Sequence, residues 1–306
     1  MRVLVTGATG FVGRHLLAAL QAGGHETVAA GGPHDAPPVV ALELFDPPAV
    51  QRVVDEAAPD AIVHLAGQAF VPQSIADPLG TLAVNATGTA HVLEAARIYR
   101  DRVQAPLRVL VISSAEVYGI ARPERMPLDE TAVVRPGNPY AASKLAAETF
   151  ALAWHRAYGL DCVIARPFNH IGPGQDTRFV VASFARQLAE IAAGAPPLLL
   201  VGNLEAQRDF LDVRDVVAAY VLLLENGRLG EVYNISSGRP VAIREVLRQL
   251  ITIARVPVEI REDPARMRAS DLPVLSGDST KLRAATGWEP QYSLTDSLRE
   301  IYANAR

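Results

Sequence analysis

Tyr140 and Lys144 lie four residues apart in the stretch NPYAASKLAAE, residues 138–148. The proline, the alanines and the leucine of this stretch are typical of the first turns of a helix. In a helix the two side chains share one face, one turn apart. A phenol beside an ammonium group can exchange a proton with a substrate oxygen, because the cation lowers the pKa of the phenol toward neutral pH. The alternative is a packing tyrosine next to a solvated lysine.

Two serines end an apolar run in VISSAEVYG, residues 111–119. In a parallel sheet Ser113 and Ser114 would lie at the carboxyl edge, where ligands bind in open α/β folds. A serine hydroxyl, Tyr140 and Lys144 together suit hydride transfer to or from a carbon that bears oxygen. The tyrosine would exchange the proton, the serine would hydrogen-bond to the oxygen, and the lysine would hold the nicotinamide ribose.

A glycine-rich turn joins the first apolar run to a helical stretch in VLVTGATGFVGRHLLAAL, residues 3–20. Gly7 permits the tight turn, Gly10 permits close approach of a pyrophosphate, and Gly13 permits close packing of helix and strand. The helix N-terminus adds amide donors and a favourable dipole. The spacing G-x-x-G-x-x-G is one residue wider than the commonest dinucleotide pattern. It predicts a bound dinucleotide, against the alternative of a turn without a ligand.

The residues that distinguish NAD from NADP are missing from their usual place. A carboxylate at the end of the second strand would hold the ribose 2′-hydroxyl, and an arginine there would hold a 2′-phosphate. The segment VAAGGPHD places Gly31 and Gly32 at these positions. His34 or Arg14 could reach a phosphate, so the sequence favours NADP(H) only slightly over NAD(H).

Short β-branched runs alternate with alanine- and leucine-rich stretches, which predicts an α/β fold with a Rossmann-type doubly wound parallel sheet. The predicted strands are 2–7, 26–31, 39–44, 61–67, 108–114 and 161–168, and the predicted helices are 11–23, 49–59, 86–100 and 139–159. Later segments predict a strong helix at 213–226, a strand at 230–238 that rejoins the sheet, and small helices at 243–254 and 279–288. We expect the NAD(P)-binding domain at 1–168 plus about 212–238, and a smaller discontinuous α/β substrate lobe at about 169–211 and 239–306.

Composition narrows the class of protein. The chain has 306 residues, 49% hydrophobic and 20% charged, with a net charge of −4 and a pI near 6.0. This balance argues against a nucleic-acid partner, and no apolar run is long enough to span a membrane. The single cysteine, Cys162, lies in an apolar run and is expected to be a buried structural thiol. We expect a cytoplasmic protein without a metal site.

The chain resembles the extended short-chain dehydrogenases/reductases that modify nucleotide sugars. The matching pieces are TGATGFVGRHL, HLAG, NATGT, ISSAEVYG, PYAASK and RPFNHIGPGQ, all within the first 175 residues. The resemblance implies that Ser114, Tyr140 and Lys144 are catalytic and that Asn85 supports the site. It also implies cofactor contacts from Gly7, Gly10, Phe11, Val12, Gly13, Glu43, Leu44, Leu65, Ala66, Gly67, Tyr140 and Lys144.

RPFNHIGPGQ, followed by VGNLEAQRDFLDVRDVVAAY, is most similar to the GDP-4-keto-6-deoxy-D-mannose reductases. That similarity extends over nearly the whole chain and implies contacts with a GDP-linked sugar. The implied substrate contacts are Asn169, Val180, Asn203, Arg208 and Arg268. The guanidinium groups of arginines are well suited to bind phosphate. The alternative for Arg208 is a salt bridge with Asp209 or Asp212. The alternative for Arg266 and Arg268 is a run of solvated charges.

Reductases, dehydratases and epimerases of this group share the Ser–Tyr–Lys set. The dTDP-glucose dehydratases that this group contains carry an Asp-Glu pair after the serine, whereas this chain has Ala115 and Glu116. Glu116 is kept as a candidate base or a structural residue.

We expect NAD(P)H-dependent reduction of the C4 keto group of a GDP-4-keto-6-deoxyhexose to a GDP-6-deoxyhexose such as GDP-D-rhamnose. A 4-epimerase or a GDP-mannose 4,6-dehydratase-like enzyme is the alternative, and a non-catalytic nucleotide-binding module is a remote one. The family resemblance further implies a homodimer through the helices at 86–100 and from 139.

Overall fold

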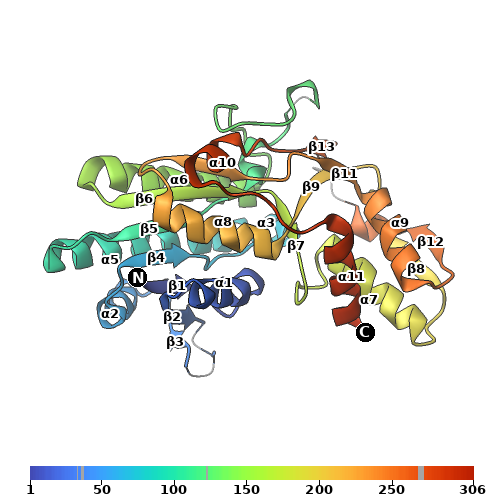
Figure 1. Ribbon diagram of the computed structural model, residues 1–306, viewed down its shortest axis with the longest axis horizontal. Helices are drawn as coiled ribbons and strands as arrows, with labels where there is room; N and C mark the ends of the chain where they lie inside the picture. The colour runs from blue at the N-terminus through green and yellow to red at the C-terminus, as the bar shows by residue number, and fades with distance from the viewer. Residues whose placement is uncertain (33, 36–37, 122, 268–271) are drawn as a thin grey trace.

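A seven-stranded parallel sheet forms the centre of the computed structural model, which describes residues 1–32, 34–35, 38–121, 123–267 and 272–306 (Figure 1). The strand order is β10-β6-β5-β4-β1-β2-β3. The bounds are β1 Arg2–Thr6, β2 Glu26–Gly31, β3 Val40–Ala41, β4 Ala61–His64, β5 Arg108–Ile112, β6 Asp161–Pro167 and β10 Val232–Ile235. The order reverses direction on either side of β1, so the prediction of a doubly wound Rossmann-type sheet is confirmed.

Helices cover both faces of this sheet. The helices are α1 Phe11–Ala22 and α8 Val213–Asn226 on one face, and α2 Pro47–Ala57, α5 Gly88–Val103 and α6 Pro139–Tyr158 on the other. Successive side chains of a strand point to opposite faces, so Val3 and Val5 join the core under α1 and α8, whereas Leu4 joins the other core. Burial on both faces explains why these strands are continuous apolar runs.

Helix α6, which carries Tyr140 and Lys144, has a well-defined start and end. The side chain of Asn138 caps it by accepting from the backbone N–H of Ala141 at 2.9 Å, and Pro139 occupies the first turn. The helix ends at Gly159, whose φ of +67° suits a glycine C-cap. These end signals, together with the alanines between them, hold the 20-residue helix along the sheet.

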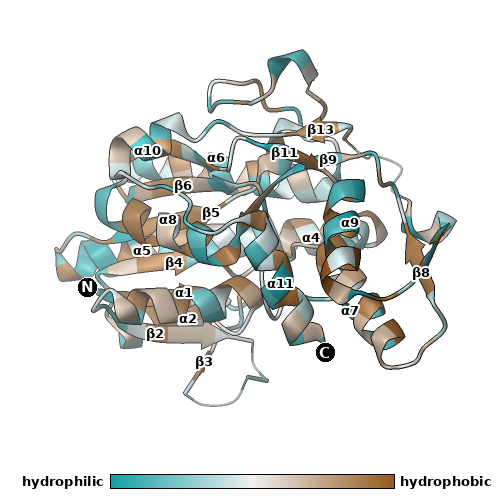
Figure 2. Ribbon diagram, turned by 45° about the vertical axis from the view of Figure 1, so that its right-hand side comes forward, coloured by the Kyte–Doolittle hydropathy of each residue, from teal (hydrophilic) through white to brown (hydrophobic). Residues whose placement is uncertain are grey.

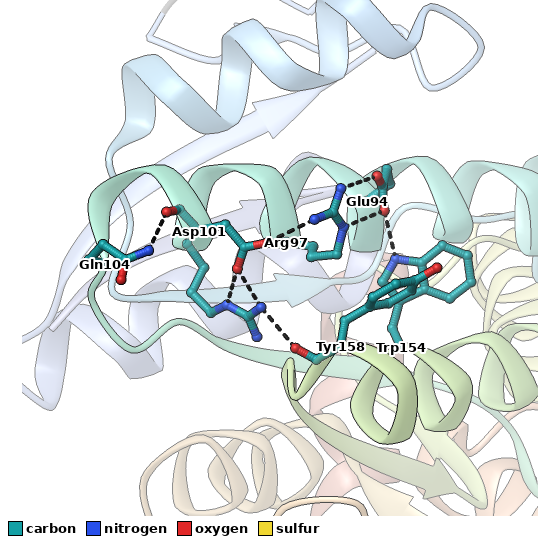
Figure 3. A network of polar contacts seen from close by, with 7 residues as sticks. Glu94, Arg97, Asp101, Gln104, Trp154 and Tyr158 are labelled. Atoms are coloured by element: carbon teal, nitrogen blue, oxygen red, sulfur yellow. Dashed lines mark hydrogen bonds and ion pairs between the residues drawn. The ribbon is translucent and has the colours of Figure 1, made fainter.

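Polar contacts tie α6 to α5 along their outer side (Figure 3). Glu94 accepts from Nε1 of Trp154 at 3.0 Å and receives a bidentate pair from Arg97 at 2.7 and 3.0 Å. Arg97 also donates to Asp101 at 2.8 Å, and its guanidinium lies over the ring of Tyr158. The side chain of Arg97 is only one-quarter exposed. The two helices therefore form one firm layer against the sheet.

A smaller lobe is built from later segments that are discontinuous in sequence. Its strands are β7 Asn169–Ile171, β8 Leu198–Val201, β9 Gln207–Asp212, β11 Pro240–Ala242, β12 Glu259–Glu262 and β13 Val274–Leu275. Its helices are α7 Val180–Ala192, α9 Ile243–Ala254 and α11 Leu294–Ala305, which pack together on a core of their own. Figure 2 shows both hydrophobic and hydrophilic residues on α9, as expected of a helix with one buried face.

Short elements complete the chain, and one of them departs from expectation. They are α3 Val71–Ala76, α4 Pro78–Leu82, the π-helical turn η1 Ala83–Thr87, the 3₁₀ turns η2 Ala115–Tyr118, η3 Pro123–Arg125 and η4 Pro264–Arg266, and α10 Thr280–Thr286. Helix α10 was expected in the smaller lobe. Instead Leu282 and Trp288 join the core under α1 and α8, and Nε1 of Trp288 donates to the carbonyl of Asp215 at 2.9 Å. Burial of these two apolar side chains on α8 explains the difference.

None of the helices in the described ranges is long and apolar enough to cross a membrane.

Candidate functional site

A cleft of about 1420 Å³ lies where the carboxyl edge of the large sheet faces the smaller lobe. It brings together residues that the sequence assigned to the cofactor, to catalysis and to the substrate. These residues are Gly7, Gly10, Phe11, Val12, Gly13, Leu65, Gly67, Ser114, Glu116, Tyr140, Lys144, Asn169, Val180, Asn203 and Arg208. A volume of this size can hold an elongated dinucleotide together with a second ligand.

The glycine loop at the base of the cleft is shaped by close backbone contacts. Gly7 has a φ of +69°, and a Cβ on it would lie 2.7 Å from the nitrogen of Ala66. A Cβ on Gly13 would lie 2.4 Å from the carbonyl oxygen of Gly7. Helix α1 starts at Phe11 without a side-chain cap, so its first amides are available to a ligand. The loop therefore has the shape and the free amides that the pyrophosphate of a dinucleotide would need.

Tyr140 and Ser114 meet at the centre of the cleft. Both are buried, with 8% of each residue exposed, and the side chain of Ser114 lies close enough to the phenol to oppose a rise in its pKa. Burial nevertheless raises the pKa of Tyr140 to about 12, and the charge of Glu116 acts in the same direction. The expectation that Lys144 brings this pKa toward neutral pH is therefore not met in the structure, because desolvation of the phenolate outweighs the favourable contacts. A phenol with this pKa is protonated at neutral pH and suited to donate a proton.

Lys144 lies one turn along α6, and its ammonium group faces the end of β5. Nζ donates to the carbonyl oxygen of Ile112 at 2.9 Å. Burial lowers the pKa of Lys144 to about 8, and the negative charge of Glu148 opposes that shift. A Cβ on Gly67 would lie 3.5 Å from Nζ, so the glycine leaves the ammonium open to the cleft. The group remains a cation at neutral pH and can donate to a ribose hydroxyl.

Asn85 supports this region from the π-helical turn η1. Its side chain donates to the carbonyl of Gln68 at 2.9 Å and accepts from the Gln68 amide at 2.8 Å. It also donates to Oγ of Ser143, the residue before Lys144, at 2.9 Å. Asn85 is 1% exposed. It therefore joins the cleft wall at residues 67–68 to helix α6, which agrees with a supporting role.

Glu116 lies beside Tyr140 and Ser114 at the mouth of the cleft. Its backbone amide donates to Oγ of Ser114 at 3.2 Å, and its carboxylate accepts from the side chain of Asn138 at 3.3 Å. Asn138 is the N-cap of α6, so this contact ties η2 to the start of that helix. The carboxylate is thus partnered structurally while it lines the cleft.

A buried polar network anchors the strand ends behind the candidate catalytic residues. Arg166 makes a bidentate pair with Glu148 at 2.7 and 2.8 Å and donates to the hydroxyl of Tyr118 at 3.0 Å. Ser113 donates to the same Glu148 carboxylate, and Tyr118 donates to the side chain of Asn234 at 2.7 Å. The network connects β6, β10, η2 and α6 to Ser113, the residue after β5, and therefore fixes the neighbours of Ser114 and Lys144. The sequence singled out neither Glu148 nor Arg166, although Glu148 continues the four-residue spacing of Tyr140 and Lys144.

Tyr220 on α8 is a further side chain that the sequence did not identify. It lines the cleft, is 1% exposed, and lies close enough to Tyr140 for the charge of one phenolate to raise the pKa of the other. Its hydroxyl has no hydrogen-bond partner among the described residues. A buried polar atom of this kind normally has a partner, which agrees with a ligand that enters the cleft. The sequence could not single out Tyr220, because this residue lies in an apolar helical stretch whose pattern indicates only core packing.

The substrate side of the cleft is formed by the smaller lobe. Asn169 starts β7, Val180 starts α7, and Arg208 on β9 donates to the backbone carbonyls of Gln207 and Leu272 at 2.8 and 2.6 Å. Asn203 accepts from the amide of Glu205 at 2.9 Å. Arg208 is 7% exposed and still lines the cleft. Arg268 lies outside the described residues.

The carboxylates proposed as alternative partners of Arg208 have other neighbours. Asp209 accepts from the amides of Ser237 and Gly238 at 2.8 and 2.9 Å, and Asp212 makes an ion pair with Arg214 at 2.8 Å. Arg266 contacts Ser183 at 3.0 Å and lines the cleft, which distinguishes it from a purely solvated charge.

The segment 166–175, which contains the end of β6 and the whole of β7, is held against the start of α1. The ring of His170 stacks on Phe11 with 6.3 Å between centroids, and its Nδ1 lies 3.0 Å from the carbonyl oxygen of Phe168. Burial lowers the pKa of His170, so the ring is neutral at neutral pH. Arg14 donates to the carbonyls of Thr9 and Gly174 at 2.9 and 3.3 Å. These contacts join the substrate side of the cleft to the glycine loop.

Some predicted positions lie outside the lining of the cleft. Glu43 is exposed, and its carboxylate accepts from the amide of Phe45 at 3.2 Å; neither it, Leu44 nor Ala66 is a lining residue. Leu44 packs close to Gly88 instead. Cys162 is fully buried, as predicted for a structural thiol, and this burial raises its pKa to about 12. The described residues contain no group of three or more side chains able to hold a metal ion.

Comparison with known proteins agrees with this geometry. The family described as GDP-mannose 4,6 dehydratase matches residues 4–301. GDP-6-deoxy-D-mannose reductase of Pseudomonas aeruginosa is 42% identical over 99% of this chain and 96% of its own length. The structure of RMD from Pseudomonas aeruginosa complexed with NADPH is 40% identical, with a TM-score of 0.89 over 100% of this chain and 99% of that chain. UDP-glucose 4-epimerase of Thermus thermophilus in complex with NAD is 32% identical, with a TM-score of 0.87 over 100% and 99% of the two chains. The chain belongs to the GDP-mannose 4,6-dehydratase family of extended short-chain dehydrogenases/reductases.

Proposed function

We propose that this protein reduces the C4 keto group of a GDP-4-keto-6-deoxyhexose with NAD(P)H, forming a GDP-6-deoxyhexose such as GDP-D-rhamnose. The observation that carries the proposal is the single cleft in which the glycine loop, Ser114, Tyr140 and Lys144 meet the arginine-bearing smaller lobe. The 42% identity to a GDP-6-deoxy-D-mannose reductase supports the same substrate class.

The chemistry divides among the residues of the cleft. The reduced nicotinamide, when bound, supplies a hydride to C4. Ser114 donates a hydrogen bond to the carbonyl oxygen, and Tyr140 transfers its phenolic proton to that oxygen as negative charge develops. The pKa of Tyr140, raised to about 12 by burial, keeps this proton in place until the alkoxide forms. Lys144 holds the cofactor ribose as a cation.

Binding residues follow from the same placement. Gly7, Gly10 and Gly13, with Phe11 and Val12 at the start of α1, would hold the cofactor pyrophosphate, while Leu65 and Gly67 would line its path. Asn169, Val180, Asn203 and Arg208 would contact the nucleotide sugar on the opposite side. Arginine is suited to the diphosphate because its planar fork binds two phosphate oxygens at once.

A reductase is favoured over its relatives by the residues next to Ser114. A dehydratase needs an added acid and base to eliminate water across C5 and C6, and position 115 is an alanine that cannot supply a proton. Glu116 could act as a base, but its carboxylate is held by the side chain of Asn138. An epimerase with the same Ser–Tyr–Lys set remains the alternative.

The cofactor, assembly and location belong to the same proposal. The NADPH-bound structure from Pseudomonas aeruginosa supports use of NADP(H), which we expect to be slightly preferred over NAD(H). A homodimer through α5 and α6 is supported by small exposed side chains on one face of α6, at Ala142, Thr149, Ala153 and Ala157. A free buried thiol agrees with a cytoplasmic location.

The test follows NAD(P)H absorbance with GDP-4-keto-6-deoxymannose as substrate. Wild-type protein should oxidise the reduced cofactor, and Tyr140→Phe should bind cofactor without turnover. Absence of oxidation with both NADH and NADPH would exclude a reductase. Turnover of a GDP- or UDP-sugar without added reductant would instead identify the epimerase or dehydratase. Light scattering measures the oligomeric state, which Ala153→Arg should change from dimer to monomer.

A further inference from the structure

The phenolic hydroxyl of Tyr220 on α8 is a buried polar group that the fold leaves unsatisfied. Its oxygen has no hydrogen-bond partner among the described residues, and only 1% of the residue is exposed. A buried hydroxyl without a partner costs free energy, so such groups in folded proteins are normally paired. Because Tyr220 lines the large cleft, we expect its partner to be a group of the ligand that the cleft receives.

The surroundings of Tyr220 are apolar and belong to the cofactor side of the cleft. Helix α8 packs against α1, which follows the glycine loop, and against β5, which leads to Ser114. Phe11, Leu65 and Ile112 pack in the same core as Tyr220, and all three line the cleft with it. A lone water among such side chains would lack the two to four polar partners that hold buried water. A ligand group that fits this place is therefore largely apolar and able to form one hydrogen bond.

Tyr140 lines the same part of the cleft as Tyr220. The two phenols lie close enough for the charge of one to raise the pKa of the other, but they share no hydrogen bond, so their hydroxyls lie apart. The glycine loop would hold the pyrophosphate of a dinucleotide, and Lys144 would hold the adjoining ribose. The ring at that end of the dinucleotide would then reach the space between Tyr140 and Tyr220.

We propose that the hydroxyl of Tyr220 hydrogen-bonds to the carboxamide of the nicotinamide ring. This inference rests on the proposed NAD(P)H cofactor. The reduced ring is flat and uncharged, and the carboxamide is its one polar substituent, so it matches an apolar site with a single phenol. A hydrogen bond to the carboxamide restricts rotation of the ring about its bond to the ribose, and therefore orients the ring toward the sugar at Tyr140. Burial raises the pKa of Tyr220, which keeps the phenol neutral and able to donate.

Tyr220→Phe removes the hydroxyl and keeps the aromatic ring. Calorimetry measures the dissociation constants of NADPH and NADH without turnover, each paired with the same molecule lacking its nicotinamide, which are ADP-ribose 2′-phosphate and ADP-ribose. The reduced nicotinamide is uncharged, so the two members of a pair carry the same charge. We expect Tyr220→Phe to weaken the binding of NADPH and NADH about fivefold to tenfold, and to leave the binding of the two ADP-ribose compounds unchanged.

Tyr233→Phe is the matched control, because Tyr233 lies in the same core, is fully buried and does not line the cleft. Its hydroxyl accepts from the backbone amide of Arg228 at 3.0 Å. Tyr233→Phe should leave all four dissociation constants unchanged and should lower the urea midpoint of the ligand-free protein. Tyr220→Phe should not lower that midpoint, since its hydroxyl has no partner to lose among the described residues.

The outcomes separate this inference from the proposed function. If the wild-type protein binds none of the four compounds, the proposed cofactor and the role of Tyr220 both fail. If it binds them and Tyr220→Phe binds NADPH and NADH as tightly as the wild-type protein does, only the role of Tyr220 fails. An equal loss of affinity for the ADP-ribose compounds, or a fall in the urea midpoint as large as that of Tyr233→Phe, assigns the hydroxyl to the fold and also overturns the inference.

Discussion

Loss of the buried ion pair between Arg166 and Glu148 should destabilise the whole protein. The two residues are 6% and 2% exposed, and their two hydrogen bonds are 2.8 and 2.7 Å long. Arg166→Met removes those bonds and the bond to Tyr118, and leaves the buried Glu148 carboxylate without its hydrogen-bonded cation. Breaking a buried pair in this way costs about 3–5 kcal/mol of unfolding free energy.

Urea unfolding followed by circular dichroism measures this loss. With a slope of about 3 kcal/mol per molar, the midpoint should fall by about 1 M or more. The matched control is Arg244→Met, which breaks an ion pair with Glu205 whose side chains are 60% and 75% exposed. An exposed pair contributes less than about 1 kcal/mol, so this control should change the midpoint little.

The double variant Glu148→Gln/Arg166→Met tests the electrostatic reason for the loss. It removes both charges, so it should lose less stability than the sum of the single variants, by about 2 kcal/mol or more. The reasoning would be refuted if the stability lost by the double variant equals the sum of the losses of the two single variants. It would also be refuted if the urea midpoint of Arg166→Met falls no further than that of Arg244→Met. Because Ser113 donates to Glu148, kcat should also fall in the single variants at temperatures where they remain folded.

Three further predictions concern the cleft. Tyr140→Phe should lower kcat by about 10²–10⁴-fold while calorimetry shows unchanged cofactor affinity; full activity would remove the phenol from the mechanism. Because the pKa of Lys144 is lowered to about 8, the cation is present below that pH, and kcat/KM should decline above it. Glu148→Gln should move this decline to lower pH, since the carboxylate raises the pKa of Lys144; a decline only near the ordinary value of 10.5 argues against the assignment. Gly13→Ala places a Cβ 2.4 Å from a carbonyl of its own loop and should weaken NAD(P)H binding at least tenfold, roughly the effect of a displaced phosphate contact. The Cβ of Gly137→Ala would have no atom within 4 Å, so this control variant should bind NAD(P)H as the wild-type protein does. Equal NAD(P)H affinities of the two variants would contradict the packing role of Gly13.

Local sequence patterns determined most of the large domain. The apolar runs at the first strands, the glycine loop and the Asn138–Pro139 helix start are short-range signals, because strand burial, turn geometry and helix capping depend on a few neighbouring residues. They were enough to predict the sheet, the helix that carries Tyr140 and Lys144, and the glycine loop between the first strand and the first helix. Tyr140 and Lys144 lie four residues apart on a helix that begins where expected. This spacing indicated the candidate catalytic pair.

Tertiary structure alone decided the features that depend on distant segments. Burial by the surrounding elements, and not the neighbouring lysine, controls the pKa of Tyr140. Helix α10 packs on the large domain because Leu282 and Trp288 find an apolar surface there, which no local pattern indicates. Arg166 meets Glu148 only because β6 lies beside α6. Desolvation and long-range contacts are properties of the assembled core, so they became visible only once the chain was folded.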